Sequence, residues 1–430
     1  MNYKNKIILG GLIGNIVEAY DMSICYFLSS ELSRELLGDS QGKPTVILSL
    51  IFIAYLAKPI GAFLLGLLSD IYGRKKVLIA SIIIMGFSTA LIGLIPNYNK
   101  IGLLAPLFLL CCRIIQSMAL GSEFLNSSSL LVESGADKQR GFRGCWSSVG
   151  VKAGYLIACV LVEGLHYYSK GQPDTQYWRI PFLLALISTG VGFYIRSKMP
   201  ESLAYVLYYA NRRKPSTQII YRQSVDFIKK YPFIVNFAFF TSFLSVSTGY
   251  FFYLYIPMHA VQHTELSRHF IMLSTICSLL LVTTLIPLFG WLSDKSDRLI
   301  LLSAASACLV LLSYPFMQAI NYGNATYFFC MQLLISIPCA CYYSVATVVL
   351  TELFPLPIRC TSLSIIYALA ASLASGLPPL LSDYLVRRTH YLSAPSLIII
   401  SLAGIVLANS QILTQKHREE KNKYNLLFAD

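Results

Sequence analysis

Ionisable side chains lie inside several long apolar stretches of this sequence, where a charge is costly. Glu18 and Asp21 are three residues apart in the first stretch, so they share one face of a helix. An ionised side chain at the centre of a bilayer costs at least about 2.5–3.5 kcal/mol on insertion scales. Such charges must therefore face one another or a water-filled cavity. In the first half of the chain they are Lys58, Arg113, Lys152, Glu18, Asp21 and Glu123.

The same stretches carry groups that can bind a small polar solute. Arg113, Gln116 and Glu123 follow one another at steps of three and seven residues, which places them on one helical stripe. The apolar stretches of the second half carry almost no charge and offer tyrosines instead. We therefore expect a polar cavity between the halves, with charges from the first and aromatic or hydroxyl groups from the second. The expected solute-binding residues are Arg113, Lys152, Lys58, Tyr55, Gln116, Tyr253 and Tyr342.

Plainer interpretations of these residues stay open. The charges could pair internally and only brace the first half of the molecule. A tyrosine in a membrane helix is often a packing residue or an interface anchor. Lys58 and Lys152 could also extend along their helices until the ammonium groups reach water.

A proton path through this chain would have to use carboxylates, because the six His residues lie in loops or at helix ends. A buried carboxylate beside a cation can take up a proton on one side of a membrane and release it on the other. A solute carboxylate that competes for Arg113 or Lys152 would couple the two movements. We rank Glu123 and Asp21 ahead of Glu18 as the proton carrier, because Glu123 shares a stripe with Arg113 and Asp21 lies deeper than Glu18.

Composition indicates a polytopic membrane protein. The 430 residues are 55% hydrophobic and 13% charged, with a mean hydropathy of +0.60, whereas soluble proteins carry about 25% charged residues. The net charge of +13 does not indicate nucleic-acid binding, because Lys and Arg gather in short loops. The eleven Cys lack metal-ligand spacing, and the chain shows no catalytic or nucleotide-binding motif. We expect no enzyme activity, cofactor or metal, and energy from an ion or solute gradient.

Twelve apolar runs predict an all-α protein with twelve transmembrane helices. If the N-terminus is cytoplasmic, twenty-three Lys and Arg fall on that side, among them Arg196 in the central loop, and seven on the other. This bias predicts an inner-membrane protein with both termini in the cytoplasm. The expected spans are 7–30, 45–68, 77–96, 101–131, 146–166, 179–197, 232–257, 269–292, 299–319, 325–350, 361–385 and 393–412.

A charged turn between apolar runs occurs twice and divides the chain into two related halves. Residues 66–76 read GLLSDIYGRKK, and residues 290–298 read GWLSDKSDR. Gly, Leu-Ser-Asp and Arg keep their places at an offset of 224 residues, which indicates an internal repeat of membrane segments. The predicted units are a six-helix half over 1–197, a cytoplasmic central loop over 198–231, a second six-helix half over 232–412 and a cytoplasmic tail over 413–430.

The repeated turns predict a device that closes one side of the protein. We expect Asp70 to accept hydrogen bonds from the start of the next helix, and Arg74 to stay in the cytoplasm. The alternative is that Arg74 and its basic neighbours only set the topology. Acid–base pairs seven residues apart follow each turn and could close that side. The residues expected to act in gating are Asp70, Arg74, Glu133, Arg140, Asp294, Arg298, Glu352 and Arg359.

These motifs resemble the major facilitator superfamily, and within it the metabolite:proton symporter branch, which includes proline/betaine, shikimate, citrate and 2-oxoglutarate transporters. The resemblance implies alternating access and inward symport of a solute with protons. Ala19, Lys58, Ser117, Ser122 and Lys152 depart from the branch pattern, and the long coiled-coil tail of its osmosensing proline/betaine members is missing. The resemblance rests on the turn at 66–76, on Gly14 to Glu18, Lys58-Pro59, Arg113 to Gln116, Gly121 to Glu123, Trp178 to Phe182, Pro200 to Ser202 and Glu352 to Pro355.

The sequence therefore predicts a proton-coupled symporter of a small organic solute, either a zwitterion such as proline or betaine or an organic acid. The alternatives are a gradient-independent facilitator, an exporter and a membrane sensor that binds solute without moving it. The expected partners are the solute, protons and the lipid bilayer, without nucleic acid, and the expected state is a monomer.

Overall fold

The computed structural model describes residues 3–38, 44–134, 139–169, 176–201, 205–207 and 216–419. All the regular structure in these ranges is helical. Twelve helical segments in the same ranges are long and apolar enough to cross a membrane. The expected central loop and tail fall partly outside the described residues.

Within the residues that the structure describes, the first half contains ten helices and one short 3-10 turn. They are α1 (Tyr3–Phe27), α2 (Ser29–Leu37), α3 (Pro44–Tyr55), α4 (Lys58–Tyr72), α5 (Arg74–Leu94), α6 (Tyr98–Ile101), α7 (Leu104–Ala119), α8 (Glu123–Glu133), α9 (Arg140–Tyr168), η2 (Gln176–Trp178) and α10 (Arg179–Ser197).

The second half follows a connecting helix, α12 (Thr217–Lys230). Its elements are α13 (Pro232–Tyr250), the π-helical turn η3 (Phe251–Tyr255), α14 (Ile256–His263), α15 (Arg268–Ser293), α16 (Arg298–Tyr322), α17 (Ala325–Glu352), η4 (Leu356–Ile358), α18 (Arg359–Thr389) and α19 (Ser396–Glu419).

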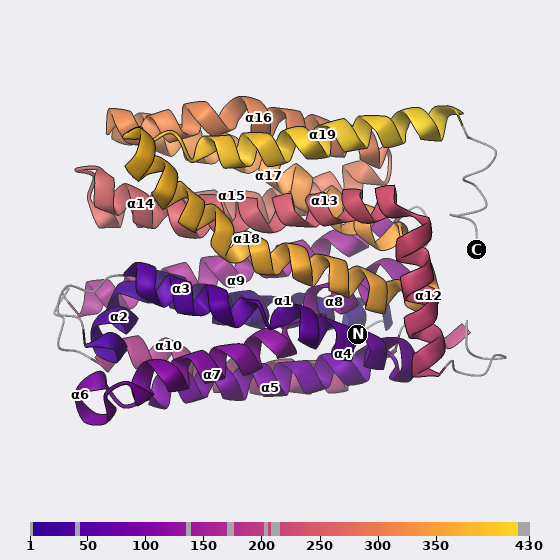
Figure 1. The fold of residues 1–430 in the computed structure, drawn as a ribbon, viewed down its shortest axis with the longest axis horizontal. Coiled ribbons are helices and arrows are strands. Elements are labelled where there is room, and N and C mark those ends of the chain that lie inside the picture. Colours follow the sequence, from indigo (N-terminus) through magenta and orange to yellow (C-terminus); the bar gives the residue numbers. More distant parts are fainter. Residues whose placement is uncertain are drawn as a thin grey trace.

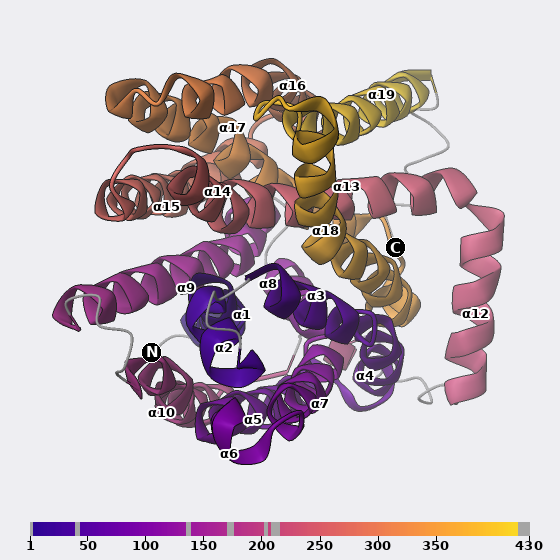
Figure 2. The same cartoon turned by 60° about the vertical axis from the view of Figure 1, so that its left-hand side comes forward.

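The helices form two bundles that lie side by side. Figure 1 shows the first half in indigo and magenta and the second half in rose, orange and yellow, with α12 along one end and α6 at the other. The halves meet where α9 packs against α15 and α18 packs against α4, and Figure 2 shows α9 and α18 between the bundles. The predicted twelve-helix, two-half fold is confirmed. We refer below to the α12 end and the α6 end of the bundle.

Three of the spanning segments are interrupted near their middle. A non-helical step separates α3 from α4, another separates α7 from α8, and η3 separates α13 from α14. Gly121 lies in the second step, where an added Cβ would be 2.1 Å from the backbone nitrogen of Ala62. Only glycine permits this close approach of two helices. Breaks of this kind are common where transporters build their binding sites.

The segment that joins the halves is partly helical, whereas the sequence predicted a loop over 198–231. Ile220, Ser224 and Phe227 follow one another at helical spacing and are buried, so α12 has one face against the bundle. The Phe227 ring lies 5.2 Å from the Phe354 ring. Helix α12 contacts α4 of the first half and α18 of the second, so it bridges both at one end.

Candidate functional site

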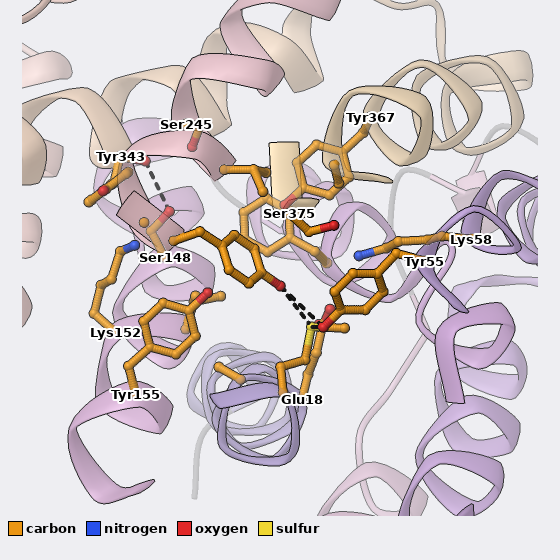
Figure 3. Close-up of a pocket in the computed structure, with 18 residues that line it drawn as sticks. Glu18, Tyr55, Lys58, Ser148, Lys152, Tyr155, Ser245, Tyr343, Tyr367 and Ser375 are labelled. Carbon is orange, nitrogen blue, oxygen red and sulfur yellow. Dashed lines mark hydrogen bonds between the residues drawn. The ribbon is translucent and has the colours of Figure 1, made fainter. Parts of the chain in front are cut away.

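A cavity of about 60 Å³ lies between the two halves, which is room for several water molecules. Its polar lining comes from α1, α3, α4 and α9 on one side and from α13, α17 and α18 on the other. Figure 3 shows Lys152 and Lys58 at opposite sides of the cavity. The polar side chains that line it belong to Glu18, Tyr55, Lys58, Ser148, Lys152, Tyr155, Ser245, Tyr250, Tyr343, Tyr367 and Ser375.

Lys152 extends from α9 into an aromatic box. Its Nζ lies 3.7 Å from the ring centroid of Tyr343, 5.1 Å from that of Tyr155 and 5.4 Å from that of Tyr253. An added Cβ at Gly249 would lie 2.9 Å from this Nζ, so glycine leaves the space that the ammonium occupies. Among the described residues no carboxylate forms an ion pair with Lys152. Ring faces hold this charge, and it can attract an anion.

Glu18 and Lys58 form the other charged part of the cavity. Both side chains are buried, and both line the cavity. The Lys58 Nζ lies 5.8 Å from the ring centroid of Tyr367, whose ring stacks on Phe124 at 5.2 Å. Oε2 of Glu18 has no hydrogen-bond partner among the described residues. This buried carboxylate oxygen is therefore available to a solute or a proton.

Tyrosines form the wall between these charges. The Tyr55 and Tyr250 hydroxyls lie 3.4 Å apart and both donate to Sδ of Met22, at 3.1 and 3.3 Å. The Tyr250 ring lies 5.2 Å from the Tyr26 ring and 6.4 Å from the Tyr55 ring. Clustered aromatic faces of this kind attract cations such as quaternary ammonium groups.

Arg113 and Gln116 belong to a separate buried chain and are not among the residues that line the cavity. Arg113 donates to Oε1 of Gln116, and the Gln116 amide donates to Oγ1 of Thr89 at 2.6 Å. Thr89 in turn donates to Oδ2 of Asp21 at 2.8 Å. Oδ1 of Asp21 has no partner among the described residues. The structure thus joins Asp21 to Arg113 through two polar side chains.

Glu123 lies in another cluster and pairs with Arg196. The Arg196 guanidinium and the Ser81 hydroxyl both donate to the Glu123 carboxylate. Arg196 is completely buried in α10, whereas sequence analysis placed it in the central loop. It lies over Gly14, where an added Cβ would be 1.4 Å from a guanidinium nitrogen. The break between α7 and α8 separates Glu123 from the helix that carries Arg113.

The two tyrosines expected from the second half lie near the cavity but are not among its lining residues. Tyr253 faces Lys152, and its hydroxyl donates to Oγ of Ser336 at 3.4 Å. The Tyr342 hydroxyl donates to the Thr241 carbonyl at 3.0 Å. Its neighbour Tyr343 reaches the cavity instead, because successive residues of a helix point about 100° apart.

The first repeated turn joins the halves at the α12 end. Oδ2 of Asp70 accepts hydrogen bonds from the backbone nitrogen of Thr361 at 2.8 Å and from its hydroxyl at 2.6 Å. Asp70 therefore caps α18 of the other half, where the helix dipole favours a negative charge, and not the next helix as predicted. Arg74 is 1% exposed and lies 3.4 Å from Glu133, which also accepts from Arg359 at 3.1 Å.

The second turn repeats this arrangement with the halves exchanged. Asp294 accepts hydrogen bonds from the backbone nitrogens of Gly141 and Phe142 at 2.7 and 2.8 Å, so it caps α9 of the first half. Arg298 donates to both oxygens of Glu352. Arg140 lies 3.9 Å from the same carboxylate. All eight residues that the sequence predicted to act in gating thus lie at the α12 end.

Residues just after α10 brace the first turn, although the sequence did not predict that they belong to it. Glu201 accepts from the backbone nitrogens of Arg74 and Lys75 at 3.0 and 3.2 Å and so caps α5. The Tyr205 ring lies 4.7 Å from the Arg74 guanidinium. Burial raises the pKa of the Tyr205 phenol, with Arg74 opposing the shift, so this hydroxyl stays a donor to the Ile71 carbonyl. The Pro200-Glu201-Ser202 motif was the available signal.

Comparison with known proteins decides the family. A model of the Major Facilitator Superfamily matches residues 11–331 and, in a second match, residues 238–426. The chain belongs to the Major Facilitator Superfamily. It is therefore a multi-pass membrane transport protein and not an enzyme.

Curated relatives match almost the whole chain. A putative proline/betaine transporter of Staphylococcus aureus (strain COL) is 27% identical over 425 residues, covering 97% of this chain and 90% of that protein. The ectoine/proline transporter ProP of Corynebacterium glutamicum is 27% identical over 424 residues, covering 93% and 82%. The proline/betaine transporter of Escherichia coli (strain K12) is 27% identical over 414 residues, with the same coverage.

Solved structures match the fold. The proton:xylose symporter XylE bound to 6-bromo-6-deoxy-D-glucose superposes with a TM-score of 0.73 at 16% identity, covering 96% of this chain and 95% of that chain. An inward-open conformation of XylE from E. coli gives a TM-score of 0.68 at 17% identity, covering 94% and 95%. These superpositions support the two-half architecture.

Proposed function

We propose that this protein is a proton-coupled symporter of a small zwitterion that carries a carboxylate and a cationic nitrogen. The observation that carries the proposal is the distribution of charge in the central cavity. Lys152 offers an ammonium without an ion-pair partner among the described residues, and Glu18 offers an unpartnered carboxylate oxygen. Tyrosine faces lie between them. The names of the relatives, proline/betaine and ectoine/proline transporters, agree with such a solute.

The solute would bridge the two halves. Its carboxylate would meet Lys152 from α9, next to Tyr343 of the second half, and its cationic group would meet Glu18 and the tyrosine faces. Binding would draw the halves together around the solute. Alternating access would then require the contacts of Asp70 and Asp294 at the α12 end to break when that end opens. We place the α12 end in the cytoplasm, because Lys and Arg concentrate in its loops, and we propose a monomer.

Asp21 and Glu18 are the carboxylates that we propose to carry the proton. Each has one oxygen without a hydrogen-bond partner among the described residues. Glu18 touches the solute cavity, and Asp21 connects through Thr89 and Gln116 to Arg113. Glu123 is held by Arg196, and its neutralisation would leave a buried guanidinium without a counter-charge. This favours a structural role for Glu123 over the coupling role that its stripe predicted.

A second candidate solute is an organic acid. Lys152 and Lys58 lie at opposite sides of the cavity (Figure 3), an arrangement that suits the two carboxylates of a dicarboxylate. Glu18 disfavours a dicarboxylate, because the second carboxylate of the solute would meet the Glu18 carboxylate near Lys58. Labelled dicarboxylate uptake therefore belongs in the same assay as labelled proline and glycine betaine.

Uptake into proteoliposomes tests the proposal. With an inwardly directed proton gradient, we expect labelled proline or glycine betaine to accumulate above its external concentration, and a protonophore to abolish the accumulation. Equilibration that ignores the gradient would show a facilitator, and binding without uptake would show a sensor. Accumulation of a dicarboxylate alone would replace the zwitterion by an organic acid.

A further inference from the structure

A second, smaller cavity lies beside the central one on its α6 side. Its volume is about 20 Å³, room for about one water molecule. Tyr26 of α1, Tyr255 of η3, and Ser375, Pro379 and Asp383 of α18 are among its lining residues. Ser375 lines the central cavity as well, so the two cavities are neighbours. We refer to this smaller cavity as the vestibule.

A hydrogen bond that depends on a proline joins the two halves at Ser375, the residue that both cavities share. In a helix the Ser375 carbonyl would accept from the backbone nitrogen four residues later, but that residue is Pro379, which has no N–H. The Tyr26 hydroxyl donates to this carbonyl instead, at 3.1 Å. The bond joins α1 of the first half to α18 of the second. When the halves separate at the α6 end, it must break, and a main-chain acceptor is then exposed to both cavities.

Asp383 adds a carboxylate to the same space. The Tyr255 hydroxyl donates to its Oδ1 at 3.0 Å, and no Lys, Arg or His in the described ranges forms an ion pair with it. An acidic side chain that forms no ion pair within a membrane-spanning helix is costly, and such residues commonly mark a ligand pathway. The vestibule lining contains no cationic side chain.

We propose that the vestibule is a transient binding site for the cationic group of the solute, between the Asp383 carboxylate and the freed Ser375 carbonyl. This site rests on the proposed function only in requiring a solute with a cationic nitrogen. An ammonium with N–H groups can donate to both acceptors. A trimethylammonium group meets Asp383 by charge and Tyr26 and Tyr255 by their ring faces. From here the solute reaches the central cavity once Tyr26 has moved away from Ser375.

Replacement of Asp383 tests the vestibule site. Counterflow of labelled proline measures the half-saturation concentration without a proton gradient. We expect Asp383→Asn to raise the half-saturation concentration of labelled proline about tenfold for influx in right-side-out membrane vesicles. Efflux through inverted vesicles, which starts from the α12 end, should keep its half-saturation. Asp383→Glu should restore most of the influx affinity. Glu265→Gln is the matched control, because Glu265 is exposed in the loop between α14 and α15 at the same end.

Three results would overturn the vestibule site: an unchanged influx half-saturation in Asp383→Asn, an equal change in both directions, or an equal effect of Glu265→Gln. Failure of the proposed coupling looks different. Wild-type protein would then show counterflow without proton-driven accumulation. The ratio of the influx half-saturation concentrations of Asp383→Asn and wild type would still test the vestibule site.

Discussion

Neutralising Asp70 should open the α12 end of the protein. Asp70→Asn keeps the size of the side chain but removes the charge that caps α18 across the interface. The two hydrogen bonds from Thr361 then go to a neutral acceptor. Arg74, which lies 3.8 Å from Asp70, keeps its contact with Glu133. The variant therefore weakens one contact between the halves and leaves the rest of the turn in place.

The size of the effect follows from these contacts. A hydrogen bond to a charged group contributes about 1.5–3 kcal/mol, and a neutral one roughly half as much. A charge at a helix N-terminus adds about 0.3–1 kcal/mol. The side-chain amide of the variant can rotate and recover part of this loss. We therefore take about 2 kcal/mol as the loss of free energy that holds the α12 end closed. That value multiplies the fraction open at the α12 end about 30-fold.

Two native cysteines report the opening. Cys360, 2% exposed, directly precedes Thr361, and Cys145, completely buried, lies beside Gly290, where an added Cβ would be 2.6 Å from its sulfur. In variants that keep only Cys360 or only Cys145, the rate of alkylation by a small maleimide measures how often the neighbouring contact opens. Asp70→Asn should speed alkylation of Cys360 by about 30-fold, the population change expected from 2 kcal/mol, and Asp294→Asn should speed that of Cys145.

Asp297→Asn is the matched control, because Asp297 caps its own helix through the backbone nitrogen of Leu299 and forms no ion pair with the other half among the described residues. It should leave both cysteines protected. The reasoning fails if Cys360 reacts at the wild-type rate in Asp70→Asn, or if Asp297→Asn exposes the cysteines equally. A large loss of equilibrium solute affinity with normal turnover would also contradict a gating role.

The remaining predictions concern the buried charges. Asp21→Asn should abolish proton-driven accumulation but keep counterflow, because the solute cavity is intact; accumulation with unchanged dependence on external pH would place the proton carrier elsewhere. Lys152→Gln should raise the half-saturation concentration for a zwitterion about 10- to 100-fold, measured by counterflow, whereas an unchanged value would remove Lys152 from the site. Glu123→Gln should destabilise the protein by about 3–5 kcal/mol through the unpaired Arg196, measured as a lower melting temperature in detergent. The double variant Glu123→Gln/Arg196→Met should recover much of that stability, and a failure to recover it would show that the loss does not come from an unpaired Arg196.

Hydropathy and the repeated turn were sufficient to predict the fold. A long apolar run can satisfy all its backbone hydrogen bonds inside a membrane by forming a helix. The number of such runs therefore gives the number of helices. The breaks at Gly121 and at η3 were not predicted, and the first depends on how closely the helix that carries Ala62 approaches. The inward face of α12 was also missed, since the amphipathic pattern at Ile220 and Phe227 is short and lies among polar residues.

The site was harder to predict because pairing between helices is a three-dimensional property. The stripe that joins Arg113 to Glu123 assumes one continuous helix, whereas a break separates them and Glu123 meets Arg196. Predicting which of Tyr342 and Tyr343 reaches the cavity requires the rotation of α17 about its axis to within about 100°, the angle between successive residues. Asp383 lies within a predicted span of the second half, but a single carboxylate near the end of a long apolar run is a weak signal for a site.

Solute-induced proton movement tests the central claim most directly. Proteoliposomes that contain the purified protein and an internal pH dye are given proline or glycine betaine, with the membrane potential clamped and no pH gradient imposed. Symport predicts that the interior acidifies as the solute enters, and that the Asp21→Asn variant shows labelled exchange without acidification. Entry of labelled solute with no change of internal pH in the wild-type protein would contradict proton-coupled symport.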